Sequence, residues 1–259
     1  MDHLRRLVIR TLYLADHPTT PRRLLDIGGG TGNFTRLLLT ANPTLEAIVV
    51  DPFLVDDEEH DNQNPRLRFV QAGAEVFAED HHTSVNSNHD ANHEALEWRR
   101  DYHHVLLKEV VHHLQDRVTI FKGMREGLAK NDNADDGGAI RYPHLLIMTR
   151  PQIEIDYPLW PAACDVWAAN QPSHDALIQE LYRAGFSRVH YSLESYPCQI
   201  ALPKWQSMVK RRFWSTFSNF TDNELDRACN NMSVLHADRL DDEGNLTFED
   251  RLVFLTAWK

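Results

Sequence analysis

The amino-acid sequence predicts an α/β protein built on a doubly wound parallel sheet. Short, continuously apolar segments alternate with helical patterns along the first 150 residues. Strands that are apolar on both sides are typical of a parallel sheet with helices on both faces. A glycine cluster at residues 28–32 joins the first such strand to a helical pattern. This strand, tight loop and helix form the strongest local signal in the chain.

The remaining elements follow from apolar periodicity and from capping signals. The first 22 residues are predicted to form an amphipathic N-terminal helix. Thr221 and Glu224 have the spacing of a capping box, which predicts that a helix begins there. Strands are expected at residues 23–27, 46–51, 68–72, 105–107, 145–148, 187–201 and 251–258. Helices are expected at residues 117–129, 173–184 and 203–219.

The length of 259 residues favours one domain with elaborations over two independent domains. Residues 23–150 form the expected core. Four of the six tryptophans lie between residues 151 and 220. This enrichment predicts aromatic-rich cap insertions at 151–172 and 203–240. Two polar stretches, at 78–100 and 131–141, are expected to be solvated loops.

Composition excludes several classes of protein. The formal net charge of −11 argues against nucleic-acid binding, because phosphates repel an acidic surface. Three scattered cysteines do not make a disulfide scaffold, which favours a reduced, cytoplasmic compartment. No apolar window approaches the length of a membrane span, and no cleavage site follows the N-terminus. The histidines between residues 81 and 104 lack metal-site spacing, so no metal is expected.

The glycine cluster does not fit a nicotinamide-dinucleotide loop, because Asn33 stands where that fingerprint has a small residue. Alternate glycines let the backbone approach a ligand closely. An acid at the end of the second strand, Asp51, suits a pair of ribose hydroxyls. Asp26 could receive an ammonium group or fix the loop. The pattern consists of Asp26, Gly28, Gly30, Gly32 and Asp51.

The segment from Leu24 to Gly32 resembles motif I of the class I S-adenosylmethionine-dependent methyltransferases. The segment from Val49 to Phe53 resembles the acidic motif that follows it. The resemblance extends through Phe69–Glu75 and Val105–Leu114, and it covers residues 22–150 well. It implies a Rossmann-like, seven-stranded sheet whose last strand is antiparallel, which fits the expected strand at 251–258.

The resemblance also implies S-adenosylmethionine as the cofactor. Asp26 and the glycines would border the methionine moiety, Asp51 the ribose, and Phe53 the adenine. The acid that the family often has after strand three is replaced by Gly73, which leaves backbone groups to serve there. The implied cofactor-binding residues are Asp26, Gly28, Gly30, Gly32, Asp51, Pro52, Phe53, Gly73, Ala74 and Lys108.

Residues 107–116 resemble the segment after strand four in small-molecule methyltransferases. In the similar plant-type O-methyltransferases a histidine at this place is the general base, which makes His112 the candidate base. The alternative is that His112 only lines the cofactor pocket. Glu109 is the second acid or base candidate. The segment lacks the Asp/Asn-Pro-Pro-aromatic signature of enzymes that methylate nucleic-acid bases.

The aromatic cap is the expected site of the methyl acceptor, because aromatic rings hold cationic or apolar groups. Basic residues in the cap could meet a carboxylate or phosphate. Simple packing against the sheet is the alternative for the same side chains. The candidate substrate-binding residues are Tyr157, Trp160, Trp167, Trp205, Arg211 and Arg212.

The sequence therefore predicts an enzyme that transfers a methyl group from S-adenosylmethionine to an oxygen, nitrogen or sulfur atom of a small metabolite. Two alternatives stay open. One is a non-catalytic protein that binds the same cofactor as an activator or scaffold. The other is a nucleotide-dependent oxidoreductase, against which Asn33 argues. The acceptor atom and the oligomeric state are left open.

Overall fold

The computed structural model describes residues 2–14, 22–54, 64–78, 97–129 and 144–259. The expected loop at 131–141 and most of that at 78–100 lie outside these residues. Two compact units are present. The sheet unit comprises Met1–Thr149, Asp175–Ser192 and Phe254–Lys259, and the aromatic unit comprises Arg150–His174 and Leu193–Val253. The assignment of the whole chain to one methyltransferase domain stays a prediction.

The predicted fold class is confirmed: the protein is α/β, with a Rossmann-like sheet of seven strands in the order β3-β2-β1-β4-β5-β7-β6. The first five strands run parallel. Strand β7 is antiparallel, since the N–H of His144, just before β5, donates to the carbonyl of Ala257 near the end of β7. The strands are β1 (Arg22–Ile27), β2 (Leu45–Val50), β3 (Leu67–Val70), β4 (His104–Lys108), β5 (Leu145–Thr149), β6 (Arg188–Ala201) and β7 (Asn245–Trp258).

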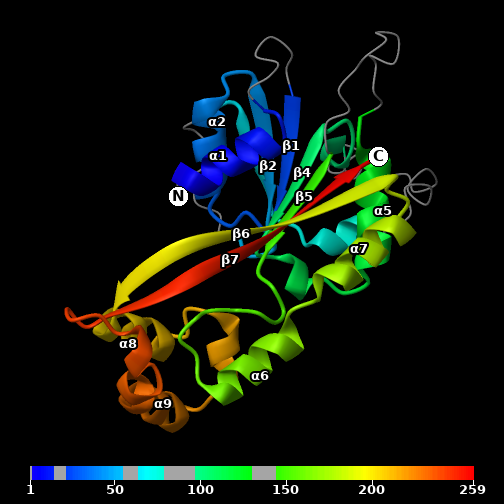
Figure 1. The fold of residues 1–259 in the computed structure, drawn as a ribbon. Helices are drawn as coiled ribbons and strands as arrows, with labels where there is room; N and C mark the ends of the chain where they lie inside the picture. The colour runs from blue at the N-terminus through cyan, green and yellow to red at the C-terminus, as the bar shows by residue number, and fades with distance from the viewer. Residues whose placement is uncertain (1, 15–21, 55–63, 79–96, 130–143) are drawn as a thin grey trace. The chain divides into compact units, whose positions relative to one another are not determined.

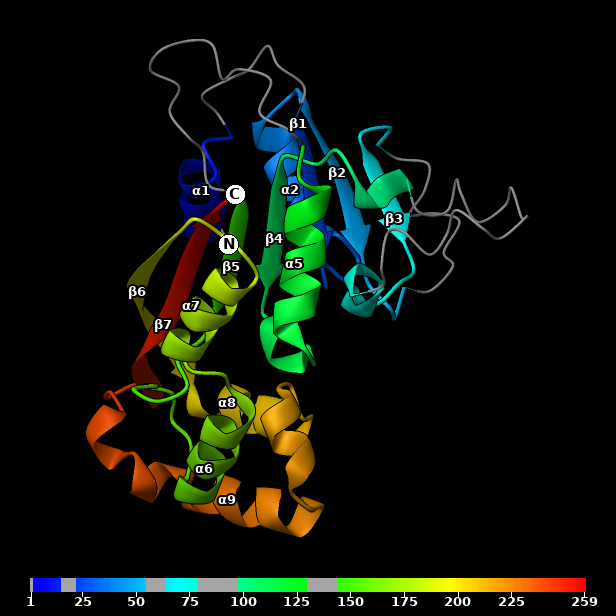
Figure 2. The ribbon, with the colours of Figure 1, turned by 90° about the vertical axis from the view of Figure 1, so that its right-hand side faces the viewer.

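Both faces of the sheet carry helices, which explains why the central strands are apolar on both sides. All five residues of β5 are buried, as are the first four of β4. Figures 1 and 2 show helices α1 and α2 on one face and helices α5 and α7 on the other. The helices are α1 (Asp2–Thr11), α2 (Asn33–Ala41), α5 (Arg117–Gly127) and α7 (His174–Arg183). Short 3-10 turns occupy Ala74–Phe77 (η1), Glu97–Arg99 (η3) and Val111–His113 (η4).

The aromatic unit contains helices α6 (Pro161–Asn170), α8 (Leu202–Lys210) and α9 (Asp222–Leu235), with 3-10 turns at Ser215–Asn219 (η5) and Ala237–Arg239 (η6). The predicted capping box begins α9: the Glu224 N–H donates to Thr221 Oγ1 at 3.4 Å, and the Thr221 N–H donates to Glu224 Oε2 at 2.8 Å. These reciprocal bonds satisfy two backbone donors at the start of the helix.

Three predicted boundaries were wrong by more than two residues. The helix expected at 203–219 ends at Lys210, because Arg212 takes a left-handed φ of 53° that an α-helix cannot continue through. The N-terminal helix ends at Thr11, before Tyr13, whose φ is 52°. The last strand begins at Asn245 instead of 251, because a turn at Gly244 starts it earlier.

Candidate functional site

Four parallel strands end level with one another in the sheet unit. In the strand register, Ile27 of β1 stands beside Val50 of β2 and Leu107 of β4, and Val50 stands beside Val70 of β3. The residues that follow these four positions therefore emerge at one edge of the sheet. Ligands of doubly wound sheets bind at this carboxyl edge.

The glycine loop after β1 uses the conformations that only glycine adopts without strain. Gly28 has φ 71°, and a Cβ there would lie 2.6 Å from Val110 Cγ2. Gly30 has φ 54°, yet a Cβ there would meet no atom within 4 Å. The backbone at Gly30 thus borders open space, whereas the space beside Gly28 is filled by the Val110 side chain from the segment after β4. Gly32, with φ 71°, caps α2.

Asp51, the first residue after β2, ties the glycine loop to its own strand. Its Oδ2 accepts the Gly30 N–H at 2.9 Å, and its Oδ1 accepts the Phe53 N–H at 2.9 Å. The side chain is buried. Two backbone donors hold this carboxylate in one orientation beside the open stretch of the loop.

Asp26, near the end of β1, lies beneath the loop with only 2% of its surface exposed. Its Oδ2 accepts a hydrogen bond from the Thr35 hydroxyl. Its Oδ1 is buried and has no hydrogen-bond partner in the part of the chain that the structure describes. Burial raises the pKa of Asp26 to about 6, with Asp51 adding to the rise, while Thr35 and Lys108 act to lower that pKa.

The segments after β2 and β3 complete the edge. The ring of Phe53 is 87% exposed, beside the exposed Pro52. Gly73 is extended, and Ala74 is buried at the start of η1. A Cβ at Gly73 would collide with the Glu75 carboxylate. The Glu75 carboxylate therefore lies against Gly73, the position where an acid was expected from the family resemblance.

The segment after β4 carries the two candidate acid or base groups. Glu109 has a left-handed φ of 57°, and its N–H donates to the Met148 carbonyl at 2.8 Å. Such a conformation costs a non-glycine residue about 1–2 kcal/mol and is often found at functional sites. His112 is half-buried in η4, with its ring 4.0 Å from that of His113. Lys108 lies 5.6 Å above the Phe34 ring.

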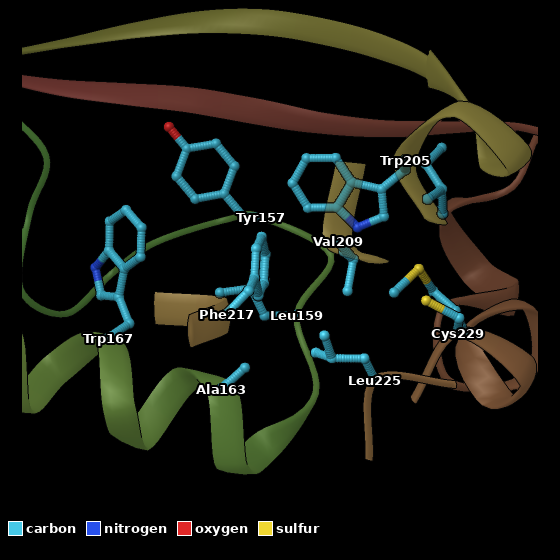
Figure 3. Close-up of a cluster of buried hydrophobic side chains, with 11 residues drawn as sticks. Tyr157, Leu159, Ala163, Trp167, Trp205, Val209, Phe217, Leu225 and Cys229 are labelled. Atoms are coloured by element: carbon cyan, nitrogen blue, oxygen red, sulfur yellow. The ribbon is translucent and has the colours of Figure 1, made fainter. Parts of the chain in front are cut away.

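Three of the six candidate substrate residues belong to the hydrophobic core of the aromatic unit. Tyr157, Trp167 and Trp205 are buried among apolar side chains (Figure 3). Each indole N–H has a backbone acceptor: Trp167 donates to the Pro151 carbonyl at 3.0 Å and Trp205 to the Pro158 carbonyl at 3.1 Å. The Tyr157 hydroxyl donates to Asp250 and accepts from Arg150.

The other three candidates retain more surface. Trp160 is half-buried and stacks on Phe217 at 5.9 Å between ring centroids. Arg212 donates to the Phe220 carbonyl at 3.1 Å and to Asp222 at 2.7 Å. Arg211 is exposed. The six candidates thus divide into core residues, an ion-paired arginine and two residues with accessible side chains.

Sequence reasoning missed three residues. Thr35 and Val110 contact the glycine-loop region, and Trp214 lies among the rings of Tyr157, Trp167 and Trp205, at 4.6 to 5.4 Å between centroids. Only Trp214 carried a usable signal, since it belongs to the tryptophan-rich stretch.

Membrane-spanning helices, metal-binding clusters and disulfides can also be looked for in the described residues. In residues 2–14, 22–54, 64–78, 97–129 and 144–259 no helix is long and apolar enough to cross a membrane. Across the same ranges no three His, Cys, Asp or Glu side chains gather to hold a metal ion. The three cysteines, all within these ranges, are free.

Comparison with protein families matches residues 2–134 to the model of a methyltransferase domain. Comparison of the sequence with curated proteins found no match.

Several solved structures share the fold. Phosphoethanolamine N-methyltransferase 2 of Haemonchus contortus, in complex with phosphomonomethylethanolamine and S-adenosylhomocysteine, is 13% identical with a TM-score of 0.50. The match covers 96% of this chain but only 52% of that one, so this chain spans about half of its length. The YcgJ protein of Bacillus subtilis is 14% identical, with 100% and 99% of the two chains covered and a TM-score of 0.55. The cyclopropane synthase MmaA2 of Mycobacterium tuberculosis is 14% identical, with 98% and 83% covered and a TM-score of 0.52.

Proposed function

The chain belongs to the family of class I S-adenosylmethionine-dependent methyltransferases, and we propose that it methylates an oxygen, nitrogen or sulfur atom of a small metabolite. The family's cofactor is S-adenosylmethionine. The observation that carries the proposal is the sheet edge where Asp51 and the open backbone of Gly30 adjoin. The same edge presents Glu109 and His112.

The residues at this edge fit the cofactor. The open space at Gly30 allows a ligand to approach the backbone, and the fixed Asp51 carboxylate suits ribose hydroxyls. The exposed Phe53 ring offers a face for adenine. We propose that the cofactor is held by Asp26, Gly28, Gly30, Gly32, Asp51, Pro52, Phe53, Gly73, Ala74 and Lys108.

When bound, S-adenosylmethionine supplies a methyl group that its sulfonium already activates. The protein's tasks are then to align the acceptor for in-line displacement and to exclude water. His112 would accept a proton from a hydroxyl or protonated nitrogen at the acceptor, with Glu109 as the second candidate. A thioether, carboxylate or free amine would need no base, and His112 would then act as a wall of the site.

We propose that the acceptor site involves residues of two kinds, some that could contact the acceptor and some that would hold the shape of the site. They are Tyr157, Trp160, Trp167, Trp205, Arg211 and Arg212. Trp160 and Arg211 have surface to offer a ligand. Tyr157, Trp167 and Trp205 are buried in the core of the aromatic unit and Arg212 is ion-paired there, so their contribution would be to hold the shape of a site.

Calorimetry with S-adenosylhomocysteine tests the proposal directly. We expect an affinity in the micromolar range, about −8 kcal/mol, and much weaker binding of NAD and NADP. Asp51→Ala should weaken binding by about 1–3 kcal/mol, because it leaves buried hydroxyls unpaired. Asp165→Ala, which removes an exposed acid of α6, is the matched control and should bind normally. Tight NAD binding without S-adenosylhomocysteine binding would contradict the assignment.

Transfer of the methyl group needs its own test. Protein that binds the cofactor but transfers no label from methyl-labelled S-adenosylmethionine to any of a broad panel of small metabolites would favour the non-catalytic alternative.

A further inference from the structure

The hydroxyl of Thr35 is completely buried, although it lies in the first turn of a helix that borders the glycine loop. It donates to Asp26 Oδ2. A buried hydroxyl without a bond would be costly, and a bond to a charged acceptor is stronger than one to a neutral group. Since Asp26 lies in β1 and Thr35 in α2, this bond joins the elements on the two sides of the loop.

The loop itself restricts the Asp26 carboxylate. A Cβ on Gly29 would lie 2.6 Å from Asp26 Oδ2, so the loop backbone passes directly over that oxygen. The carboxylate can therefore keep only a narrow range of orientations, with Oδ2 beneath the loop and bonded to Thr35. The other oxygen, Oδ1, is the buried atom that has no hydrogen-bond partner in the described residues. Buried polar atoms without partners are rare, and each calls for an explanation.

The charge of Asp26 depends on groups from three neighbouring elements. Burial in the sheet raises its pKa, the Asp51 carboxylate of the β2 side adds to the rise, and the Lys108 ammonium of β4 opposes it. From α2, the Thr35 hydroxyl also lowers the pKa, because a donated hydrogen bond stabilises the ionised form. The resulting pKa of about 6 leaves Asp26 mostly ionised at neutral pH.

We propose that Thr35 is a positioning residue of the cofactor site, whose hydroxyl keeps Asp26 ionised and oriented beneath the glycine loop. The buried carboxylate then presents its negative charge toward the ammonium group of the bound methyl donor. The inference rests on the proposed function, because the charge that Asp26 serves is the ammonium group of S-adenosylmethionine, which S-adenosylhomocysteine also carries. Cofactor binding and ionisation of Asp26 favour each other, so binding should release protons near pH 6.

The first test measures the affinity for S-adenosylhomocysteine between pH 5 and pH 8 by calorimetry. In the unaltered protein the affinity should fall below about pH 6. In Thr35→Val, which keeps the shape but loses the hydroxyl, the fall should move up by about one pH unit. The variant should then bind about fivefold more weakly at pH 6 and almost normally at pH 8. Thr35→Ser should behave like the unaltered protein, and Asp26→Asn should lose this pH dependence.

The second test needs no cofactor. Carboxyl-carbon NMR follows the titration of Asp26, whose midpoint should rise by about one pH unit in Thr35→Val and stay unchanged in Thr35→Ser. Thr35→Ala, which also lacks the hydroxyl, should raise the midpoint too, and it provides the test should Thr35→Val not fold.

The outcomes separate the two proposals. An unchanged midpoint in Thr35→Val, or a loss of affinity that is equal at every pH, would overturn the role of Thr35 and leave methyl transfer intact. If the midpoints shift as expected but the unaltered protein binds no S-adenosylhomocysteine at any pH, the proposed function fails. In that case the Thr35–Asp26 coupling remains, but it does not serve this cofactor.

Discussion

The carboxyl edge of the sheet and the aromatic core of the second unit differ in backbone strain and in the hydrogen bonding of their buried polar atoms. At the sheet edge, Gly28, Gly30 and Glu109 have left-handed backbone, and a buried oxygen of Asp26 has no partner in the described residues. In the aromatic core, the indoles of Trp167 and Trp205 are buried with their N–H groups bonded to backbone carbonyls.

This difference indicates a division of labour. Strained backbone and unsatisfied polar atoms cost free energy, and they often gather where a ligand or a reaction needs them. Well-packed rings with satisfied polar groups chiefly supply stability. Substitutions at the sheet edge should therefore change ligand binding or turnover, and substitutions in the aromatic core should change the free energy of unfolding.

The largest expected effect is on turnover at the sheet edge. With a hydroxyl or protonated-nitrogen acceptor, His112→Ala should slow single-turnover methyl transfer by about 10²–10⁴-fold, because a general base acts in the transition state. The rate of the unaltered enzyme should rise with pH, because imidazole must be neutral to accept the proton. His190→Ala, at an exposed position of β6, is the control and should change the rate little. Equal rates for His112→Ala and the unaltered enzyme would leave His112 as a wall residue.

The second effect is on stability in the aromatic core. Trp205→Ala should lower the free energy of unfolding by about 3–5 kcal/mol, because it empties a packed site and strands the Pro158 carbonyl. Denaturant unfolding measures the change, and Phe213→Ala, at a ring that is 61% exposed, should cost far less. If Trp205→Ala abolished cofactor binding with normal stability, the division between the two regions would be wrong.

The third effect concerns the sheet unit away from the glycine loop. Burial, with Lys259 and His103, lowers the pKa of His144 to about 4. Between pH 6.5 and pH 4 the unfolded chain takes up a proton there and the folded chain does not. His144 therefore lowers stability as pH falls through this window, by about 2–3 kcal/mol in total. The free energy of unfolding, measured from pH 4 to pH 7, should depend less on pH in His144→Gln than in the unaltered protein. The same pH dependence in both proteins would contradict a lowered pKa for His144.

The smallest effect comes from a matched pair of glycines. Gly30 and Gly244 have φ of 54° and 78°, and a Cβ at either would meet no atom within 4 Å. Alanine at each should cost about 1–2 kcal/mol of stability from backbone strain alone. Only Gly30→Ala should also weaken S-adenosylhomocysteine binding, by roughly tenfold, because its Cβ would occupy the space offered to the ligand. Equal binding by the two variants would place the cofactor elsewhere.

The sheet and its loop could be predicted because local signals and global fold agree there. Buried parallel strands are apolar along most of their length, and the left-handed conformations at Gly28 and Gly30 strongly favour glycine. The prediction of a helix at 203–219 was wrong because of one backbone conformation that the apolar pattern does not reveal. Its apolar periodicity continued past Lys210, but the left-handed Arg212 gave no sign in the pattern.

Amino-acid type and order were enough to predict the α/β class, the succession of strands and helices along the chain, and the glycine loop with Asp26 and Asp51. Each of these depends on periodicity or on a conformation that few residues can adopt. Which side chains are buried, and which groups they pack against or bond to, was decided by the tertiary structure. A tryptophan such as Trp205 looks the same in the sequence whether it lies in a core or in a binding site. Only its neighbours from distant segments of the chain distinguish the two. The Thr35–Asp26 bond arises in the same way, since it forms only when helix α2 folds back against strand β1.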